Sequence, residues 1–202
     1  MSAVRPGLAF EPPGRRDSAH PAGRFPNDAL LDVGVARGAG QSEPAPGAQS
    51  DTPRPQVEAE YLLSVVSFTE WPADAMPGGA AVHFCVAGAD VIFSALDSAA
   101  RGDAILGRPL VVHRVGRPDE VVQCHAIFVS QGEDPRVEAF LGAAAGVPVL
   151  TMGESAAFAR AGGMVSFGIE EGRVRFDLNR SAAEARGLRF RSQLLRLARR
   201  VT

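Results

Sequence analysis

The chain has 202 residues, of which 46% are hydrophobic and 22% are charged, and its formal net charge is −2. These values are typical of one globular domain with an additional segment that is too short for a second domain. They exclude a polycation that neutralises nucleic-acid phosphates. No apolar run reaches the roughly 18 residues that a membrane-spanning helix needs, so we expect no insertion into a membrane. All 21 basic residues are arginine, which excludes reactions that require a lysine, such as Schiff-base formation.

Residues 1–55 differ in composition from the rest of the chain. They contain nine of the 15 prolines and seven of the 22 glycines, and the stretch 41–55 has no apolar periodicity. Such a segment buries too little surface to offset its chain entropy, so we expect residues 1–55 to form a disordered tail. The 147 residues of 56–202 are enough for one well-buried core, and we expect them to form a single domain.

The chain from residue 56 to 161 alternates between helix and strand patterns. Apolar spacing predicts a first helix that Trp71–Pro72 ends, and Asp90 is positioned to cap a second helix. Asp134–Pro135 predicts the start of a third helix. In chain order, we expect a helix at 56–69, a strand at 82–87, a helix at 91–100, strands at 109–115 and 126–129, a helix at 135–145, a strand at 147–151 and a helix at 155–161.

The last part of the chain departs from this alternation. Two runs with strand composition, 165–170 and 173–178, flank Glu171–Gly172 and predict an antiparallel hairpin. An amphipathic helix is then expected over 192–201. Strands that alternate with helices predict an α/β fold with a mostly parallel sheet and helices on both faces, to which the hairpin adds an antiparallel edge.

Charge is unevenly distributed along the domain. Residues 56–172 carry six arginines and 15 acidic residues, whereas residues 173–202 carry nine arginines and two acidic residues. This basic end indicates a surface for an acidic partner, for an anionic lipid surface or for the acidic body of the same domain. A solvated helix face whose charges pair within the chain is the alternative interpretation.

Several blocks of the domain resemble the YfiR/HmsC-like family. The run Glu58–Leu63 followed by Phe68–Pro72 is similar to the family's opening helix, which ends in an aromatic residue, an acid and Trp-Pro. Later blocks follow in the family's order and spacing, at Gly162–Phe167, Gly172–Asn179, Ala185–Leu188 and Ser192–Ala198. The resemblance extends over about residues 57–201 and includes none of the tail.

The resemblance implies a Rossmann-like three-layer sandwich that forms a homodimer and has neither catalytic activity nor a cofactor. It implies a regulatory protein of the bacterial periplasm that represses a membrane-bound diguanylate cyclase, or a sensor kinase, by binding its periplasmic domain. Repression of a cyclase would lower cyclic-di-GMP and biofilm formation. Family members normally begin with a signal peptide, and no segment of 1–55 has that pattern, so we expect that the translation start assigned to this sequence is misplaced.

Five residues are candidate contacts with this partner. Phe68 and Trp71 lie at the end of the first expected helix, and aromatic side chains often anchor interfaces. Arg196, Arg199 and Arg200 lie on the polar face of the last expected helix. For Trp71, a role in filling the core is the alternative.

The two cysteines, Cys85 and Cys124, lie within one expected strand and immediately before another. If these strands are neighbours, the two Cα atoms approach the roughly 5.5 Å that a disulfide needs. Family members often carry intramolecular disulfides, so the resemblance implies a Cys85–Cys124 bond. Two buried, reduced thiols are the alternative, and in a cytosolic protein that alternative is favoured.

A second function class uses the same residues. His83, Cys85, Cys124 and His125 are the ligand types of a Cys₂His₂ zinc site, although their spacing matches no standard zinc finger and alternation in a strand separates Cys124 from His125. The alternative to a regulator is therefore a cytosolic flavodoxin-like enzyme or a metal-binding protein that uses these side chains. No nucleophile elbow, dinucleotide-binding glycine motif or phosphate loop is present, so we expect no enzyme and no metal site.

Overall fold

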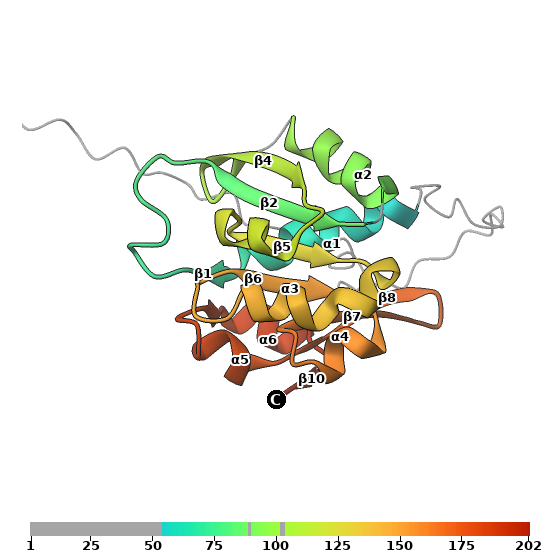
Figure 1. The fold of residues 1–202 in the computed structure, drawn as a ribbon. Helices are drawn as coiled ribbons and strands as arrows, with labels where there is room; N and C mark the ends of the chain where they lie inside the picture. Colours follow the sequence, from blue (N-terminus) through green and yellow to red (C-terminus); the bar gives the residue numbers. More distant parts are fainter. Residues whose placement is uncertain (1–53, 89, 102–103) are drawn as a thin grey trace, which may run out of the picture.

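The structure is a computed structural model that describes residues 54–88, 90–101 and 104–202. An eight-stranded sheet crosses the domain in the order β10-β8-β7-β6-β5-β2-β4-β3 (Figure 1). Its strands are β2 (Val82–Ala87), β3 (Ala104–Ile105), β4 (Arg108–Arg114), β5 (Ala126–Val129), β6 (Leu150–Gly153), β7 (Val165–Glu170), β8 (Arg173–Leu178) and β10 (Arg200–Val201). Outside this sheet, β1 (Thr69–Glu70) pairs antiparallel with β9 (Arg189–Phe190).

Most neighbours in the large sheet run parallel. β2 is parallel to β4 and to β5, β5 to β6, β6 to β7, and β10 to β8. The pairs β3–β4 and β7–β8 are antiparallel. The expected α/β class, with a mostly parallel sheet and an antiparallel hairpin near the C-terminus, is confirmed.

Helices cover both faces of the sheet, which gives three layers (Figure 1). The α-helices are α1 (Arg54–Ser67), α2 (Asp90–Ala100), α3 (Val137–Ala143), α4 (Ala156–Arg160), α5 (Arg180–Glu184) and α6 (Ser192–Leu197), and 3₁₀ segments are η2 (Pro118–Gln123) and η3 (Gln131–Arg136). Alternate residues of β2 point to opposite faces. Phe84 and Val86 enter the core beneath α1 and α2, and Cys85 and Ala87 enter a second core beneath η2, α3 and α4.

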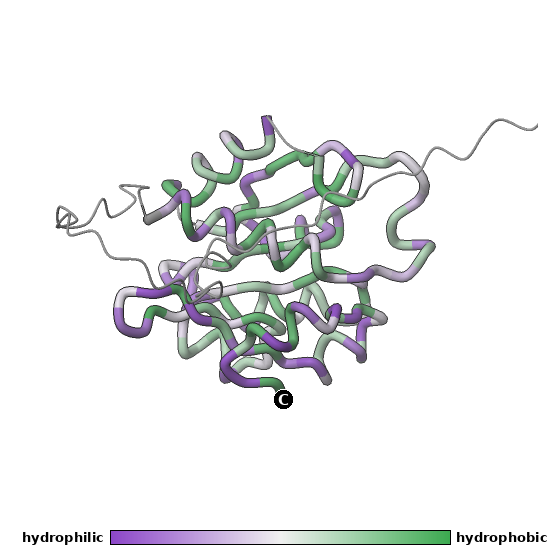
Figure 2. The backbone as a smooth tube through the Cα atoms, turned by 180° about the vertical axis from the view of Figure 1, so that it is seen from behind, coloured by the Kyte–Doolittle hydropathy of each residue, from purple (hydrophilic) through white to green (hydrophobic). Residues whose placement is uncertain are grey.

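Hydrophobic residues are concentrated along the central strands, and hydrophilic residues follow the turns and the C-terminal segment (Figure 2). Phe84, Phe128 and Leu150 are fully buried in three neighbouring strands. No helix of the described ranges has the length and apolarity that a membrane crossing would require.

Several expected element boundaries are wrong. Some differ because of a nearby proline, and others because the segment pairs with a distant strand. The helix expected at 135–145 is a 3₁₀ turn followed by α3, with Pro135 inside the 3₁₀ turn. The strand expected at 147–151 starts at Leu150, and Pro148, which lacks an N–H to donate to a sheet, lies before it. The first helix ends at Ser67, and Thr69 instead pairs with Phe190 of β9.

The last expected helix, 192–201, stops at Leu197. The chain then forms β10, and the residues on either side of it bond to β8. The Arg199 N–H donates to the Phe176 carbonyl over 2.9 Å, and the Thr202 N–H donates to the Leu178 carbonyl over 2.9 Å. These bonds satisfy an edge of β8 that would otherwise be open, and no helical pattern in the sequence reports that edge. The disordered tail expected for residues 1–55 lies outside the described residues except for its last two positions.

Gly163 allows a close contact that a larger residue would block. A Cβ atom at Gly163 would overlap the ring of Phe158, which is fully buried in the second core. We therefore expect Gly163→Ala to lower the free energy of unfolding by about 1–3 kcal/mol, as overpacked cores do. Denaturant unfolding of the purified variant measures this loss.

The matched control is Gly142→Ala in α3, where a Cβ atom meets nothing within 4 Å. Because alanine favours the helix over glycine, this control should leave the protein unchanged or stabilise it by up to about 1 kcal/mol. A Gly163→Ala variant as stable as the control would contradict the packing described here.

Candidate functional site

Three histidines lie together on neighbouring strands of the sheet. His83 in β2 and His113 in β4 point to the same face, and the His83 Nδ1 atom lies 2.8 Å from the His113 Nε2 atom. Their rings are nearly parallel, at 15° with centroids 5.1 Å apart. His125, which immediately precedes β5, places its ring 5.6 Å from that of His83 on the other side.

His125 is held by the backbone around it. Its Nδ1 atom accepts a hydrogen bond from the His83 backbone N–H over 3.0 Å, and its carbonyl accepts one from the Trp71 indole over 3.3 Å. Burial, together with the charge of His83, lowers the pKa of His125, and a hydrogen bond to the Ala75 backbone opposes that shift. The neutral ring therefore serves a structural role between strand and loop.

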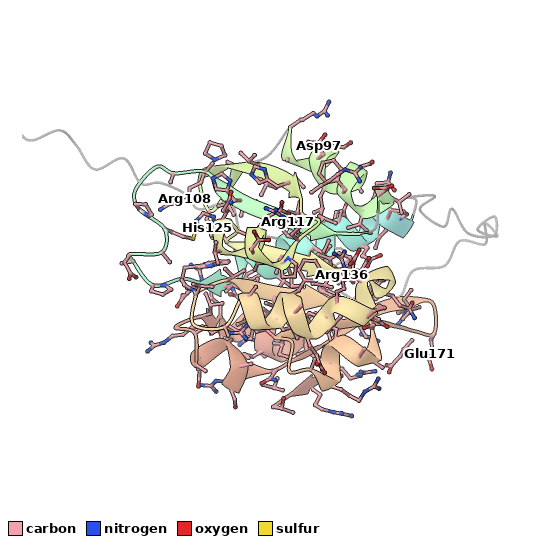
Figure 3. All side chains as sticks on the ribbon, in the orientation of Figure 1. Asp97, Arg108, Arg117, His125, Arg136 and Glu171 are labelled. Atoms are coloured by element: carbon pink, nitrogen blue, oxygen red, sulfur yellow. A yellow bond between two sulfur atoms is a disulfide. The ribbon has the colours of Figure 1, made fainter. Side chains whose placement is uncertain are left out.

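The loop between β1 and β2 is fixed by one guanidinium. Arg108 donates to the carbonyls of Met76 (3.0 Å), Pro77 (2.6 Å) and Ala80 (3.2 Å). Figure 3 places Arg108 and His125 on the same side of the molecule, beside this loop. The loop is thus tied to β4 through Arg108 and to β5 through His125.

Cys85 and Cys124 form a disulfide in the floor of the same region. Their Cα atoms are 5.9 Å apart, and the bond joins the middle of β2 to the residue that follows η2, 39 positions later. Both residues are buried in the second core with Val121, Ile127 and Phe140. The bond holds η2 against β2, next to the histidines.

The Cys₂His₂ zinc arrangement is not formed. The two sulfur atoms are bonded to each other, so neither is available as a thiolate ligand. Within residues 54–88, 90–101 and 104–202, no group of three or more histidine, cysteine, aspartate and glutamate side chains is arranged to hold a metal ion.

An open groove of about 440 Å³ lies over the disulfide and the histidine pair. It is lined by His83, Cys85, His113, Arg114, Val115, Glu120 and Gln123. Burial, and then the charge of His83, lower the pKa of His113. The backbone N–H groups of Arg117 and Gly116 lower the pKa of Glu120, so this carboxylate already has its donors.

Protein groups lie close to the backbone at the carboxyl end of β2, a position where α/β sheets commonly bind small molecules. Gly88 ends β2 with φ at +72°, and a Cβ atom there would overlap the Ser130 hydroxyl. Beside it, Arg136 donates to Glu133 and, over 2.7 Å, to the Gly116 carbonyl.

The candidate partner contacts fall into two groups. Phe68 is 8% exposed, and Trp71 is half-buried against the main core. Arg199 is held between Asp177 and Glu170, which raises the pKa of its guanidinium and lowers the pKa of Asp177. Arg196 and Arg200 are exposed, and neither forms an ion pair within the described residues, although the charge of Arg200 contributes to the lowered pKa of Asp177.

Sequence reasoning missed the pairing of His83 with His113. Both residues were recognised within strands, but the side chains meet only because β4 pairs with β2 in the register that sets His113 opposite Cys85. The spacing of residues along one strand carries no information on that register.

A model of the YfiR/HmsC-like family matches residues 55–199. Among solved structures, the fold is similar to a conserved domain protein from Vibrio cholerae O1 biovar El Tor, at 14% identity over 64% of this chain and 57% of that chain, with a TM-score of 0.46. It is also similar to the ABC domain from Streptococcus pneumonia solved in complex with L-Trp, at 10% identity over 71% of this chain and 62% of that chain, with a TM-score of 0.48. The chain spans less than two thirds of the length of either structure, and likeness at this level carries no inference about function. No curated protein matches the chain.

Removal of the disulfide should destabilise the domain strongly. A crosslink that spans 39 positions restricts the unfolded chain by about 4 kcal/mol in the chain-entropy model. We expect a Cys85→Ala/Cys124→Ala variant to lose about that much unfolding free energy, measured with urea under oxidising conditions. Reductant should destabilise the wild type and leave the variant unchanged, and equal sensitivity of the two proteins would show that the bond does not form.

As the pH falls, protonation of the histidines should lower the free energy of unfolding before the carboxylates begin to take up protons. His113 and His125 have lowered pKa values in the folded state, whereas a histidine in the unfolded chain has a pKa of about 6.5. The unfolded chain therefore takes up more protons as pH falls from 7.5 to 5.5, and the unfolding free energy should decrease over this range. His113→Gln should make the decrease shallower in urea unfolding measured across the range, and an unchanged slope would contradict this account.

Proposed function

Because the chain belongs to the YfiR/HmsC-like family, we propose that it is a regulatory binding protein of the periplasm that acts in cyclic-di-GMP signalling. The observation that carries the proposal is the family match, which extends over nearly all of the described domain. The family is regulatory rather than catalytic. In the finer form of the proposal, the protein is a homodimer that binds the periplasmic domain of a membrane-bound diguanylate cyclase and represses it.

The disulfide supports a periplasmic location. Structural disulfides persist in oxidising compartments such as the bacterial periplasm and are rare in the cytosol. Here both cysteines are buried in the second core, with Cys85 at the floor of the histidine groove. A bond in that position stabilises the fold and does not need to cycle for the protein to act.

The C-terminal segment supports binding to an acidic partner. Residues 173–202 carry nine arginines and two acidic residues. Arg180, Arg191 and Arg199 are paired with carboxylates of the domain. Arg196 and Arg200 are exposed and form no ion pair within the described residues, although Arg200 acts on Asp177 through its charge. Each of the two is followed by an exposed apolar residue, Leu197 or Val201.

We name the four residues Arg196, Leu197, Arg200 and Val201 the C-terminal patch. Leu197 is 43% exposed and Val201 is 42% exposed, and each follows an exposed arginine directly in the chain. Apolar contact surface flanked by arginine is a common composition at protein interfaces. The other three candidate contacts are engaged within the domain: Phe68 and Trp71 pack against the main core, and Arg199 is paired with Asp177 and Glu170.

Charge reversal in the patch tests the proposal. The purified protein is titrated against the isolated periplasmic domain of a diguanylate cyclase from the same organism, and affinity and association rate are measured by interferometry. Arg196→Glu and Arg200→Glu should each weaken binding about fivefold to tenfold, mostly through slower association, because exposed interfacial charges steer encounter.

The matched control is Arg101→Glu at the end of α2, near the opposite edge of the sheet, where the native guanidinium makes one exposed ion pair with Asp97. Such a pair contributes little to stability, so the control should bind as the wild type does. Equal binding by the wild type and the patch variants would show that the C-terminal patch does not contact the partner. Failure of the wild type to bind any periplasmic domain of a cyclase or a sensor kinase would reject the proposed partner.

A further inference from the structure

The His83–His113 pair joins two imidazole side chains directly, with no carboxylate, guanidinium or backbone group in the contact. Two imidazole nitrogens face each other at 2.8 Å on an open groove. A hydrogen bond between the two nitrogens accounts for the distance. The same two nitrogens are also ligands of the type that divalent transition metals prefer.

We propose that His83 and His113 form a two-histidine binding site for a divalent transition metal, with Cu²⁺ as the best-fitting ion. The His83 Nδ1 and His113 Nε2 atoms are the protein ligands. The ring that donates in the hydrogen bond first changes tautomer, so that its proton moves to its other nitrogen and both facing nitrogens are unprotonated. The metal then binds to both nitrogens, beside the line that joins them, and water or a ligand from solution completes its coordination. The site is independent of the proposed signalling partner.

The distance between the nitrogens favours a tetragonal ion. Metal–nitrogen bonds of about 2.0–2.1 Å that meet at a right angle place the two nitrogens about 2.8–3.0 Å apart. In the structure the two nitrogens face each other head-on, so each ring must turn by roughly 45° to direct its lone pair at the ion. A tetrahedral site needs a wider separation. Square or tetragonal coordination by nitrogen and oxygen is typical of Cu²⁺ and Ni²⁺, and Cu²⁺ binds such ligands most tightly of the divalent series.

The neighbouring groups leave the two nitrogens available. Arg114 also lines the groove, but its guanidinium pairs with Asp90 and lies 4.0 Å from the centre of the Phe93 ring. Arg108 donates to the carbonyls of the loop before β2. The nearest positive charges are therefore engaged elsewhere.

Two other potential ligands are excluded. The Nδ1 atom of His125 accepts the His83 backbone N–H, so this ring does not complete a three-histidine site. Both oxygens of Glu120 interact with Arg117, one through the backbone N–H and one through the guanidinium. The site has two protein ligands, in agreement with the lack of any larger ligand group in the described ranges.

Calorimetric titration of the untagged, oxidised full chain with Cu²⁺ tests the proposal. We expect one ion per chain. Joining two ligands in one chelate raises affinity about a hundredfold over either alone, so His83→Gln and His113→Gln should each weaken binding by about that factor. The double variant should be little weaker than either single variant.

The chain contains four histidines, and His20, which lies outside the described residues, supplies the matched control. His20→Gln should bind Cu²⁺ as the wild type does. Loss of affinity in the His20 variant, or a loss of less than about threefold in either site variant, would overturn the proposal.

A spectroscopic measurement on the wild-type protein tests the two-histidine site directly, so the result does not depend on whether a variant folds. Electron paramagnetic resonance of the protein with one equivalent of Cu²⁺ should show coupling to two imidazole nitrogens. Coupling to one imidazole, or to backbone amides, would overturn the proposed site.

Discussion

β2 is hydrogen-bonded to β4 along one edge and to β5 along the other, and its alternate side chains enter both cores of the domain. Phe84 is fully buried beneath α1 and α2, while Cys85, one residue later, is joined to Cys124 on the opposite face. His83 shares that opposite face and reaches the groove. The strand that organises the packing therefore also positions the disulfide and the histidine pair, and a shift of its register by one residue would exchange the two faces.

The sequence predicted those parts of the fold that local patterns specify. The strand 82–87 and the hairpin around Glu171–Gly172 are confirmed because a buried apolar run and a short glycine turn are local features. β10 was missed because the Arg199 N–H finds its acceptor, the Phe176 carbonyl, 23 residues earlier in the chain. The contact between His83 and His113 could not be predicted from the sequence for the same reason, because it depends on the register between β2 and β4.

The charges of the C-terminal segment have two different roles. Arg199 lies between Glu170 and Asp177, so it fastens β10 to the β7–β8 hairpin and is not available to a partner. Arg196 and Arg200, which flank it in the chain, remain exposed. Periodicity alone grouped all three on one helical face, and the structure separates them because the helix ends at Leu197. The proposal of an acidic partner therefore rests on two arginines and on the exposed apolar residues beside them.

The central claim is that this domain restrains cyclic-di-GMP synthesis from outside the cytoplasmic membrane. The most direct measurement is the cyclic-di-GMP content of cells that contain a membrane-bound diguanylate cyclase of the same organism, with and without the protein exported to the periplasm. The account predicts a lower content when the exported, disulfide-bonded protein is present, and no change when the cyclase lacks its periplasmic domain. An unchanged content with the complete cyclase, at equal amounts of folded protein in the periplasm, would contradict it.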